Sequence, residues 1–448
     1  MTPWRETVAQ ELRALLTEGA SSEEGSVMAT RGSVLRSAAG AAALAAIPSF
    51  ARAAGPKPVV RIGFLDSFSG VFADIAAYHK AGAELAVADL NARGRIQYEL
   101  VYGDDASKPA VGTTEARRLV AQEKVDVLFG GTSSAIGLAL GPLCDSLGIF
   151  NLELGPFDSA ITGEKASRLT YRFGPNARMS LRPLANRLPA LGKKWYFIQA
   201  DYALGRDAYA LLSDVLKHTS GSEAGHDILP LGTADFSPTM TKIRNSGADV
   251  VVLANSGIDA ANSIKQFVQF GLHKQMKLAG INLEDIYAKT VPLDDIAGSS
   301  FTVLWTPNAS DSARKLAARI GKAVKGPISA RHFYGYGGIM ALADRISGAG
   351  TTDAEKLAAA FDDHSWHGYK ANPSVWHGCD HQLAQDTYAG AIVNSKTFAK
   401  TQYVFDIVAE VPASESDGTC DSPWAVAAKK AIAAATVSKR DGYTPKIV

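Results

Sequence analysis

Short apolar runs alternate with amphipathic stretches along most of the chain, starting near residue 58. The run at 58–65 has the composition of a buried strand, and apolar residues at helical spacing over 75–93 indicate a helix that stops at Gly94. The same order recurs in expected strands at 96–105, 125–129 and 148–154, with a helix at 111–123. Strands that alternate with helices are typical of a parallel sheet.

A second series of the same kind begins at residue 193, and no low-complexity linker separates it from the first. Its expected elements are 193–201, 206–218, 226–232, 238–245, 248–257, 258–270 and 276–282. A strand-like crossover at 301–308, helices at 312–325, 330–346 and 353–362, and strands at 381–393 and 402–411 follow. We therefore expect an α/β protein with two Rossmann-like parallel-sheet lobes and a cleft between them.

The turn after the strand at 125–129 is the first candidate site. It reads Gly130-Gly131, then Thr132-Ser133-Ser134, and a helical run follows. Glycines let a backbone approach a ligand, and the free N–H groups of a first helical turn favour an anion. The turn has neither the lysine of a Walker loop nor the G-x-G-x-x-G pattern, so a nucleotide is not indicated. The alternative is that Ser133 or Ser134 merely caps the helix.

Composition excludes several classes of partner. Hydrophobic residues make up 46% and charged residues 20% of the chain, as in an ordinary globular protein. A net charge of +1 gives no reason to expect nucleic acid or acidic membranes as partners. The three cysteines and nine histidines show no zinc-ligand spacing, so we expect no metal and no cofactor.

Residues 28–53 have the pattern of an export signal. Arg31 and Arg36 precede a weakly apolar stretch, and Ala51-Arg52-Ala53 resembles a cleavage site. The stretch also resembles a twin-arginine leader with Gly32 at the second arginine, so the route is either Sec or a degenerate twin-arginine one. We expect a soluble, exported protein that begins near Ala54.

Several motifs occur in an order that resembles a known family. They include RIGFLDSFSGVFAD, GGTSSAIGLA, NLELGPFDSAIT, ADYALGRDAY and DHQLAQDTYAG. Over roughly 59–411 the chain resembles type I periplasmic solute-binding proteins of the branched-chain amino acid ABC transporter group, the Leu/Ile/Val-binding-protein-like family. The resemblance implies a periplasmic, monomeric protein whose two lobes are joined by a three-crossing hinge and trap a small-molecule ligand for an ABC permease. The expected division is lobe 1 at 57–176 and 309–370, lobe 2 at 177–308 and 371–412, and a C-terminal tail at 413–448.

The resemblance also implies ligand-binding residues at the carboxyl ends of strands in both lobes. The matching positions are Phe68, Ser69, Ser133, Ser134, Leu154, Gly155, Tyr202, Asn255, Ser256 and Asn282. Tyr334 and Tyr336, on the helix at 330–346, are further candidates for the cleft.

One position departs from the amino-acid binders of the family. They hold the ligand's ammonium with an acidic side chain, and the matching residue here is Asn282, a neutral amide. A buried ammonium without a counter-charge is strongly disfavoured. We therefore expect a small organic acid, aromatic in view of Phe68, Phe157 and Tyr202, in preference to an amino acid. Glu284 and Asp285 are close enough in sequence to restore the acid if the register shifts, so an amino-acid-specific protein is the alternative.

An enzyme and a sensory protein are the two other functional classes that the sequence brings into question. Hydrolase chemistry needs a serine with a base and an orienting group, but Ser133 and Ser134 lie outside any G-x-S-x-G motif. We expect no enzyme. A sensory binding protein of the same fold stays an alternative, because a docking surface is not a sequence motif.

The sequence also predicts a disulfide bond near the C-terminus. Cys379 and Cys420 lie in irregular C-terminal sequence, and disulfides persist in an oxidising compartment. We expect them to pair and to pin the tail to the second lobe. Cys144, in an Ala/Leu helix, is expected to be a buried free thiol.

Overall fold

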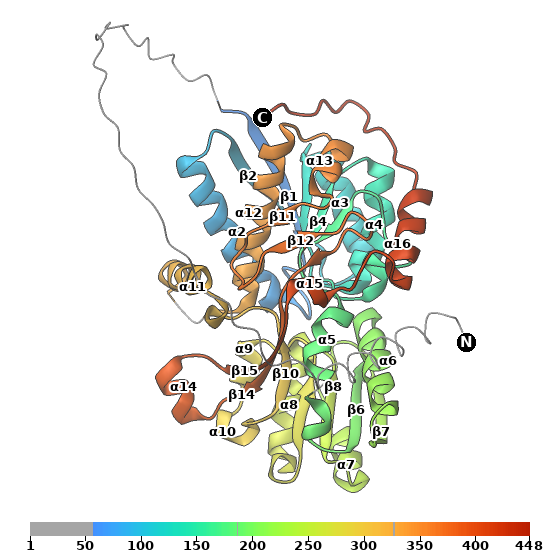
Figure 1. The fold of residues 1–448 in the computed structure, drawn as a ribbon, viewed down its shortest axis with the longest axis vertical. Coiled ribbons are helices and arrows are strands. Elements are labelled where there is room, and N and C mark those ends of the chain that lie inside the picture. Colours follow the sequence, from blue (N-terminus) through green and yellow to red (C-terminus); the bar gives the residue numbers. More distant parts are fainter. Residues whose placement is uncertain (1–56, 186, 326–327) are drawn as a thin grey trace, which may run out of the picture.

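The structure, a computed structural model, describes residues 57–185, 187–325 and 328–448, and the expected export signal at 28–53 lies outside them. Figure 1 shows two lobes, one above the other, each with a central sheet covered by helices. Across the described ranges no helix has the length and apolarity needed to cross a membrane.

The first sheet is parallel throughout, as the apolar runs at 58–172 predict. Its strand order is β2 (Gln97–Asp104), β1 (Val59–Asp66), β3 (Val127–Gly130), β4 (Asn151–Glu153) and β5 (Thr170–Arg172). Helices of this lobe are α2 (Ala73–Arg93), α3 (Pro109–Ala121), α4 (Ser134–Leu147), α11 (Asp311–Val324), α12 (Ala330–Ala349) and α13 (Ala354–Phe361). Helices on both faces explain why the central strand β3 is apolar without alternation, whereas the edge strand β2 alternates.

The second sheet holds seven strands. Their order is β15 (Phe405–Val411), β14 (Thr387–Ile392), β10 (Ser300–Val303), β9 (Lys277–Gly280), β8 (Val250–Ala254), β6 (Lys194–Ala200) and β7 (Ser222–Leu229). β14 pairs antiparallel with both neighbours, and the other pairs are parallel. Its helices are α5 (Ala177–Ala185), α6 (Ala203–Lys217), α7 (Ser237–Ser246), α8 (Gly257–Gln269), α9 (Asp285–Ala288), α10 (Leu293–Ile296) and α14 (Ser395–Thr401).

Two glycines bring α2 and α12 unusually close. A Cβ on Gly82 would collide with the backbone oxygen of His332, and one on Gly335 would collide with that of His79. Only glycine therefore fits at these crossing points. The close packing places the His79 side of α2 beside the start of α12, which carries Arg331.

The chain passes between the lobes after β5, after β10 and before β14, and the last of these crossings comes later than the expected boundary at 370–371. It then passes a fourth time: the tail that follows β15 returns to the first lobe through α15 (Ala413–Ser416) and α16 (Pro423–Ala434). There the Ser438 amide donates to the Asp145 carbonyl (3.0 Å), and the Tyr443 hydroxyl donates to Asp126 (3.0 Å).

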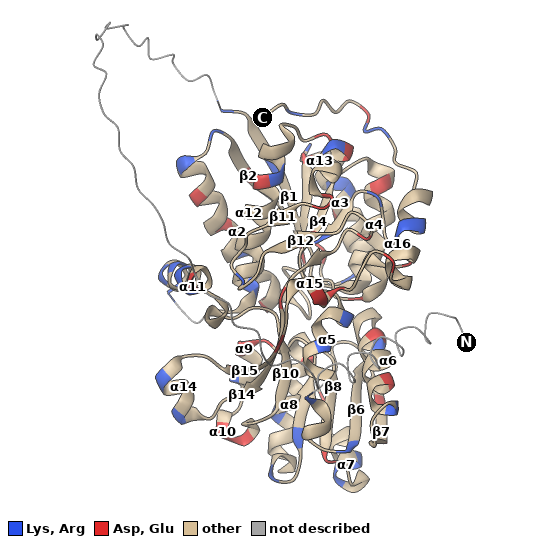
Figure 2. Ribbon diagram, in the orientation of Figure 1, with Lys and Arg blue, Asp and Glu red and all other residues tan. Residues whose placement is uncertain are grey.

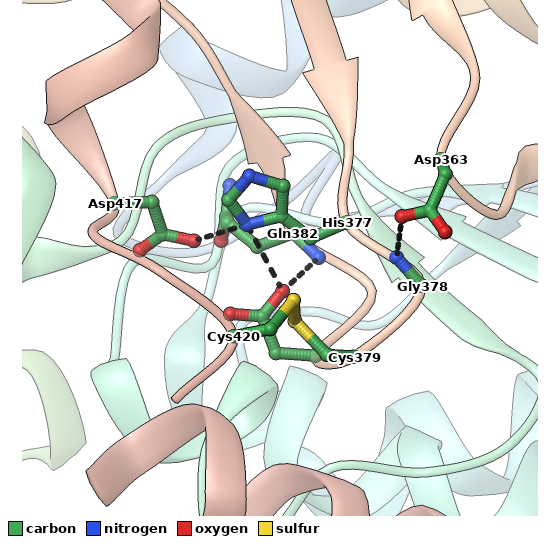
Figure 3. Close-up of a disulfide and its surroundings, with 8 residues drawn as sticks. Asp363, His377, Gly378, Cys379, Gln382, Asp417 and Cys420 are labelled. Carbon is green, nitrogen blue, oxygen red and sulfur yellow. Dashed lines mark hydrogen bonds and ion pairs between the residues drawn. A yellow bond between two sulfur atoms is a disulfide. The ribbon is translucent and has the colours of Figure 1, made fainter. Parts of the chain in front are cut away.

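The tail's attachment corrects one expectation. Cys379 and Cys420 form a disulfide (Figure 3), and Cys144 is a buried free thiol. Cys379, however, lies in the turn between β12 (Ser374–Trp376) and β13 (Leu383–Ala384), which form a small sheet with β11 (Ser365–Trp366). Next to β13, Gln382 forms a bridge with Arg172 of β5. The disulfide therefore ties the tail to the first lobe, and residues 374–384, expected in lobe 2, lie beside the first sheet.

The expected single strand over 381–393 is divided by a buried polar residue. β13 ends at Ala384 and β14 begins at Thr387, with Asp386 between them. The Asp386 carboxylate accepts hydrogen bonds from Asn372 and from the Ala413 amide (2.9 Å), so it holds two crossings side by side. The buried Lys370 amine donates to the Asp386 carbonyl (2.6 Å). Burial lowers the pKa of Lys370 to about 7, against the opposing charges of Asp386 and Glu410.

Candidate functional site

Figure 2 shows acidic and basic residues interspersed over both lobes, so neither lobe has a surface of one charge. The charge of a ligand is therefore selected by the individual residues between the lobes. Beginning with the first lobe, the turn after β3 has the geometry that the sequence predicts. Gly130 and Gly131 have φ of +123° and +85°, which glycine adopts without strain, and the Thr132 hydroxyl donates to Asp66 (2.8 Å). Ser133 is the N-cap residue of α4, yet its side chain makes no capping bond, and the first turn of α4 carries no acidic residue. The buried Ser133 hydroxyl and the start of α4 therefore suit an anion.

Ser134 has a different task. Its hydroxyl accepts hydrogen bonds from the backbone amides of Phe157 (3.0 Å) and Asp158 (3.1 Å) in the loop that follows β4. Leu154, also expected at the site, is fully buried, and its side chain lies against Gly338 of α12 in the core. Ser134 therefore holds the loop that follows β4, and Leu154 packs that loop against α12.

Arg331 is the cation that the sequence analysis missed. This guanidinium is 2% exposed and lies at the start of α12. Its Nε donates to the Glu284 carboxylate (2.6 Å), while Nη1 has no hydrogen-bond partner among the residues that the structure describes. Nη1 lies 2.6 Å from the point that a Cβ of residue 155 would occupy, so the glycine at this position gives the guanidinium its room.

His79 and Tyr334 border the same place. His79 Cε1 lies 3.4 Å from that Cβ point of Gly155, and the His79 ring is stacked on Tyr334 with 6.3 Å between centroids. Asp66 pairs with His79 Nδ1 (2.8 Å). Within the described part of the chain, His79 Nε2 and the Tyr334 hydroxyl are buried and make no hydrogen bond. Tyr336, the other tyrosine expected to reach the cleft, instead donates to Asp89 on the first lobe (3.0 Å).

The second lobe contributes hydroxyls at two helix starts. Tyr202 and Ser256 are the N-cap residues of α6 and α8, and their hydroxyls lie 2.9 Å apart. Burial raises the pKa of Tyr202, so the phenol stays neutral. The Tyr202 ring lies 6.1 Å from Phe72 of the first lobe, centroid to centroid, so the lobes touch here. Asn255 donates to Ser263 (3.4 Å), and its buried Oδ1 is unpaired in the described chain.

Asn282 uses its side-chain oxygen within the second lobe, while its buried Nδ2 has no hydrogen-bond partner in the described part of the chain. Its backbone amide donates to Thr302 Oγ1 (2.6 Å), and its Oδ1 accepts from the same hydroxyl (2.9 Å). Two residues later comes a buried acid, Glu284, which is 3% exposed and paired with Arg331. The acid that the sequence analysis left open is thus present at the lobe interface, but it already has a cation as its partner.

Phe68 and Ser69 are directed to other partners. Phe68 packs against Phe64 (5.4 Å between centroids) and Tyr102 (5.7 Å), and the exposed Ser69 donates its hydroxyl to Asp104 (2.6 Å). The turn after β1 continues to Phe72, which is the aromatic residue that reaches the second lobe. The structure therefore does not bring Phe68 and Ser69 together with the other expected residues.

The remaining geometry favours a negative charge between the lobes. The starts of α4, α6 and α8 carry the positive ends of helix dipoles, and Arg331 adds a guanidinium nitrogen, Nη1, that has no partner in the described chain. Glu284 is already paired with Arg331, and Asp66 with His79. A small anion with further hydrogen-bonding groups suits such a site.

The sequence and the fold of this chain are both similar to those of known binding proteins. The model of a family described as periplasmic binding protein matches residues 59–397. A Leu/Ile/Val-binding protein homolog 7 of Brucella suis biovar 1 (strain 1330) is 31% identical over 240 residues, which are 50% of this chain and 59% of the relative. The chain thus matches about three fifths of that relative's length.

Two solved structures share the fold. A periplasmic binding protein from Burkholderia mallei has a TM-score of 0.75 and 25% identity, covering 82% of this chain and 98% of that one. A solute-binding protein of an ABC transporter from Rhodopseudomonas palustris BisB5, in complex with 3,4-dihydroxybenzoic acid, has a TM-score of 0.73 and 20% identity, covering 80% and 99%. Because the family model spans well over half of the sequence, the chain belongs to the periplasmic binding protein family.

Proposed function

We propose that the protein is the substrate-binding component of an ABC importer, which captures a small carboxylate-containing solute between its lobes and delivers it to a membrane permease. The observation that carries this proposal is Arg331. A buried guanidinium with one nitrogen fixed by Glu284 and another unpaired in the described chain, at Gly155, is suited to a carboxylate.

The solute's carboxylate would lie between Arg331 Nη1 and the start of α4, where Ser133 adds a hydroxyl. His79 Nε2 and the Tyr334 hydroxyl, both buried, supply further hydrogen bonds to the anion or to a hydroxyl on the ligand. From the second lobe, Tyr202 and Ser256 close over the rest of the molecule. Asn255 supports this wall. The site is assembled only when the lobes meet.

Contacts across the lobes support a mechanism of closure. Phe72 meets Tyr202, Arg331 meets Glu284, and the Ser159 amide of the first lobe donates to Asp207 of α6 (2.8 Å). A ligand that binds both lobes shifts an open-closed equilibrium towards the closed form. The permease then recognises the closed protein in the periplasm, where members of this family work.

Ligand identification and calorimetry test the proposal. Protein purified from its native host without refolding should release a small carboxylic acid on denaturation, which mass spectrometry identifies. Benzoate and 3,4-dihydroxybenzoate serve as first probes, with benzamide as the uncharged control. We expect binding of a carboxylate and none of its amide. Equal binding of acid and amide, or no binding of any carboxylate among the released and tested solutes, would contradict the proposed function.

A further inference from the structure

Both oxygens of Glu284 already accept a hydrogen bond from the first lobe. Oε1 accepts the Nε–H of Arg331 (2.6 Å), and Oε2 accepts the Ser329 hydroxyl (3.2 Å). Both charged side chains are almost fully buried, and Ser329 precedes Arg331 in the turn that begins α12. The carboxylate comes from the loop after β9 in the second lobe, whereas its partners come from the first.

Other acids near the cleft are also engaged. Both Asp66 oxygens are in use, by Thr132 and the Ser67 amide on one side and by His79 on the other. Asp259 accepts the Gly232 amide with both oxygens.

Asp285, the neighbour of Glu284, faces elsewhere. It lines a cavity of about 530 Å³ at the hinge together with Trp305 and Phe398. Burial and the adjacent Glu284 charge raise the pKa of Asp285 to about 7, so it is only partly ionised at neutral pH.

We propose that the Arg331–Glu284 ion pair sets the specificity of the site, so that it accepts a carboxylate without a cationic group and rejects the corresponding amino acid. This inference rests on the proposed function and names its substrate class. Arg331 is the specificity-determining residue, and Glu284 is a positioning residue that holds the guanidinium through Nε. An ammonium brought beside Arg331 would meet a like charge, and the nearby carboxylate of Glu284 already has that guanidinium as its partner.

Removing Arg331 from the ion pair should change which ligand the site prefers. Without Arg331, Glu284 would be a buried carboxylate lacking a cation, and such a group takes up a proton or an opposite charge. A ligand ammonium can supply that charge. Removing Arg331 should therefore move the preference of the site from the plain acid towards the amino acid.

Matched ligands separate this effect from general damage. Leucine is compared with 4-methylpentanoate, and phenylalanine with 3-phenylpropanoate, because each pair differs only by the α-ammonium group. The ratio of the two dissociation constants, measured by calorimetry, is the readout. The variants are Arg331→Met, Arg331→Lys, Glu284→Gln and the double variant Arg331→Met/Glu284→Gln. Arg314→Met serves as control, because Arg314 pairs with Asp311 on the outer helix α11.

For the wild type and the Arg314→Met control, we expect the plain acid to bind at least tenfold more tightly than the amino acid. Arg331→Met should reduce that ratio at least tenfold, whereas Arg331→Lys should weaken the acid but keep the preference. Glu284→Gln should weaken the acid without improving the amino acid. The double variant, which leaves no buried charge unpaired, should show little preference even if Arg331→Met fails to fold.

The outcomes distinguish this inference from the proposed function. If the wild type binds carboxylates but holds amino acids equally well or better, the inference is overturned and the proposed function stands. An unchanged ratio in Arg331→Met, or in the double variant, overturns it in the same way. If the wild type binds no carboxylate of any kind, the proposed function fails and the inference with it.

Discussion

Replacing Gly155 by alanine tests the positioning of the guanidinium with the smallest possible change. The new Cβ would stand 2.6 Å from Arg331 Nη1, whereas ordinary contact begins near 3.4 Å, so the nitrogen must retreat by roughly 0.8 Å. The bond from Nε to Glu284 resists that movement. The backbone at this position does not need a left-handed conformation, so the fold should be kept.

The expected cost is that of one charge-assisted hydrogen bond to the ligand, about 1.5–3 kcal/mol. This corresponds to a dissociation constant raised roughly 10- to 140-fold. Calorimetry with the solute that the wild type binds measures it, and thermal unfolding checks that the variant is folded. Gly321→Ala is the matched control, because nothing lies within 4 Å of its new Cβ, and its affinity should equal that of the wild type. A folded Gly155→Ala protein with affinity within threefold of the wild type would refute the reasoning.

Three other predictions concern stability and affinity. Ser134→Ala leaves two buried amides unpaired and should destabilise the protein by about 2 kcal/mol in urea unfolding, whereas Ser133→Ala should instead weaken ligand binding; the reverse pattern would contradict both roles. Replacing Cys379 and Cys420 by serine opens a loop of 41 residues and should cost about 4 kcal/mol, and thiol titration of the denatured, unreduced wild type should find one free thiol. The folded Lys370 amine has a pKa of about 7, below its ordinary 10.5, so the unfolded chain binds more protons and the stability of the fold rises with pH between these values. Lys370→Met should remove on the order of 2–3 kcal/mol of the rise in unfolding free energy from pH 7 to 9.5. An unchanged pH profile of stability would contradict the lowered pKa of Lys370.

The fold and the first-lobe turn were predictable because their signals are local. Apolar runs separated by helical periods predict the two sheets, and Gly130-Gly131 before a helix predicts the glycine turn at the start of α4. The two serines of that turn were not distinguishable. Which hydroxyl bonds the loop at 157–158 depends on how β4 lies beside β3, and that is a tertiary relationship.

Arg331 and His79 were missed because their partners are distant in sequence. His79 of α2 is paired with Asp66 at the end of β1, and Arg331 is paired with a residue 47 positions earlier in the opposite lobe. A signal existed in the helix that begins at Ala330, where Arg331 stands about one turn before the glycines 335, 337 and 338. Glycines within a helix indicate close contact with another helix, so polar residues beside them are candidates for a buried site.

The tail's position was also beyond local reasoning. Strand periodicity over 381–393 gives no sign that Asp386 will interrupt the strand, because its bonds are to Asn372 and to the Ala413 amide. The same contacts join two crossings and send the tail back to the first lobe, where Cys420 meets Cys379 (Figure 3).

A crystal structure with the bound solute tests the central claim most directly. The account predicts closed lobes around a carboxylate with one oxygen about 3 Å from Arg331 Nη1, beside Ser133, and the rest of the ligand against Tyr202 and Ser256. A ligand bound outside the lobes, or bound between them with its carboxylate away from Arg331, would contradict it.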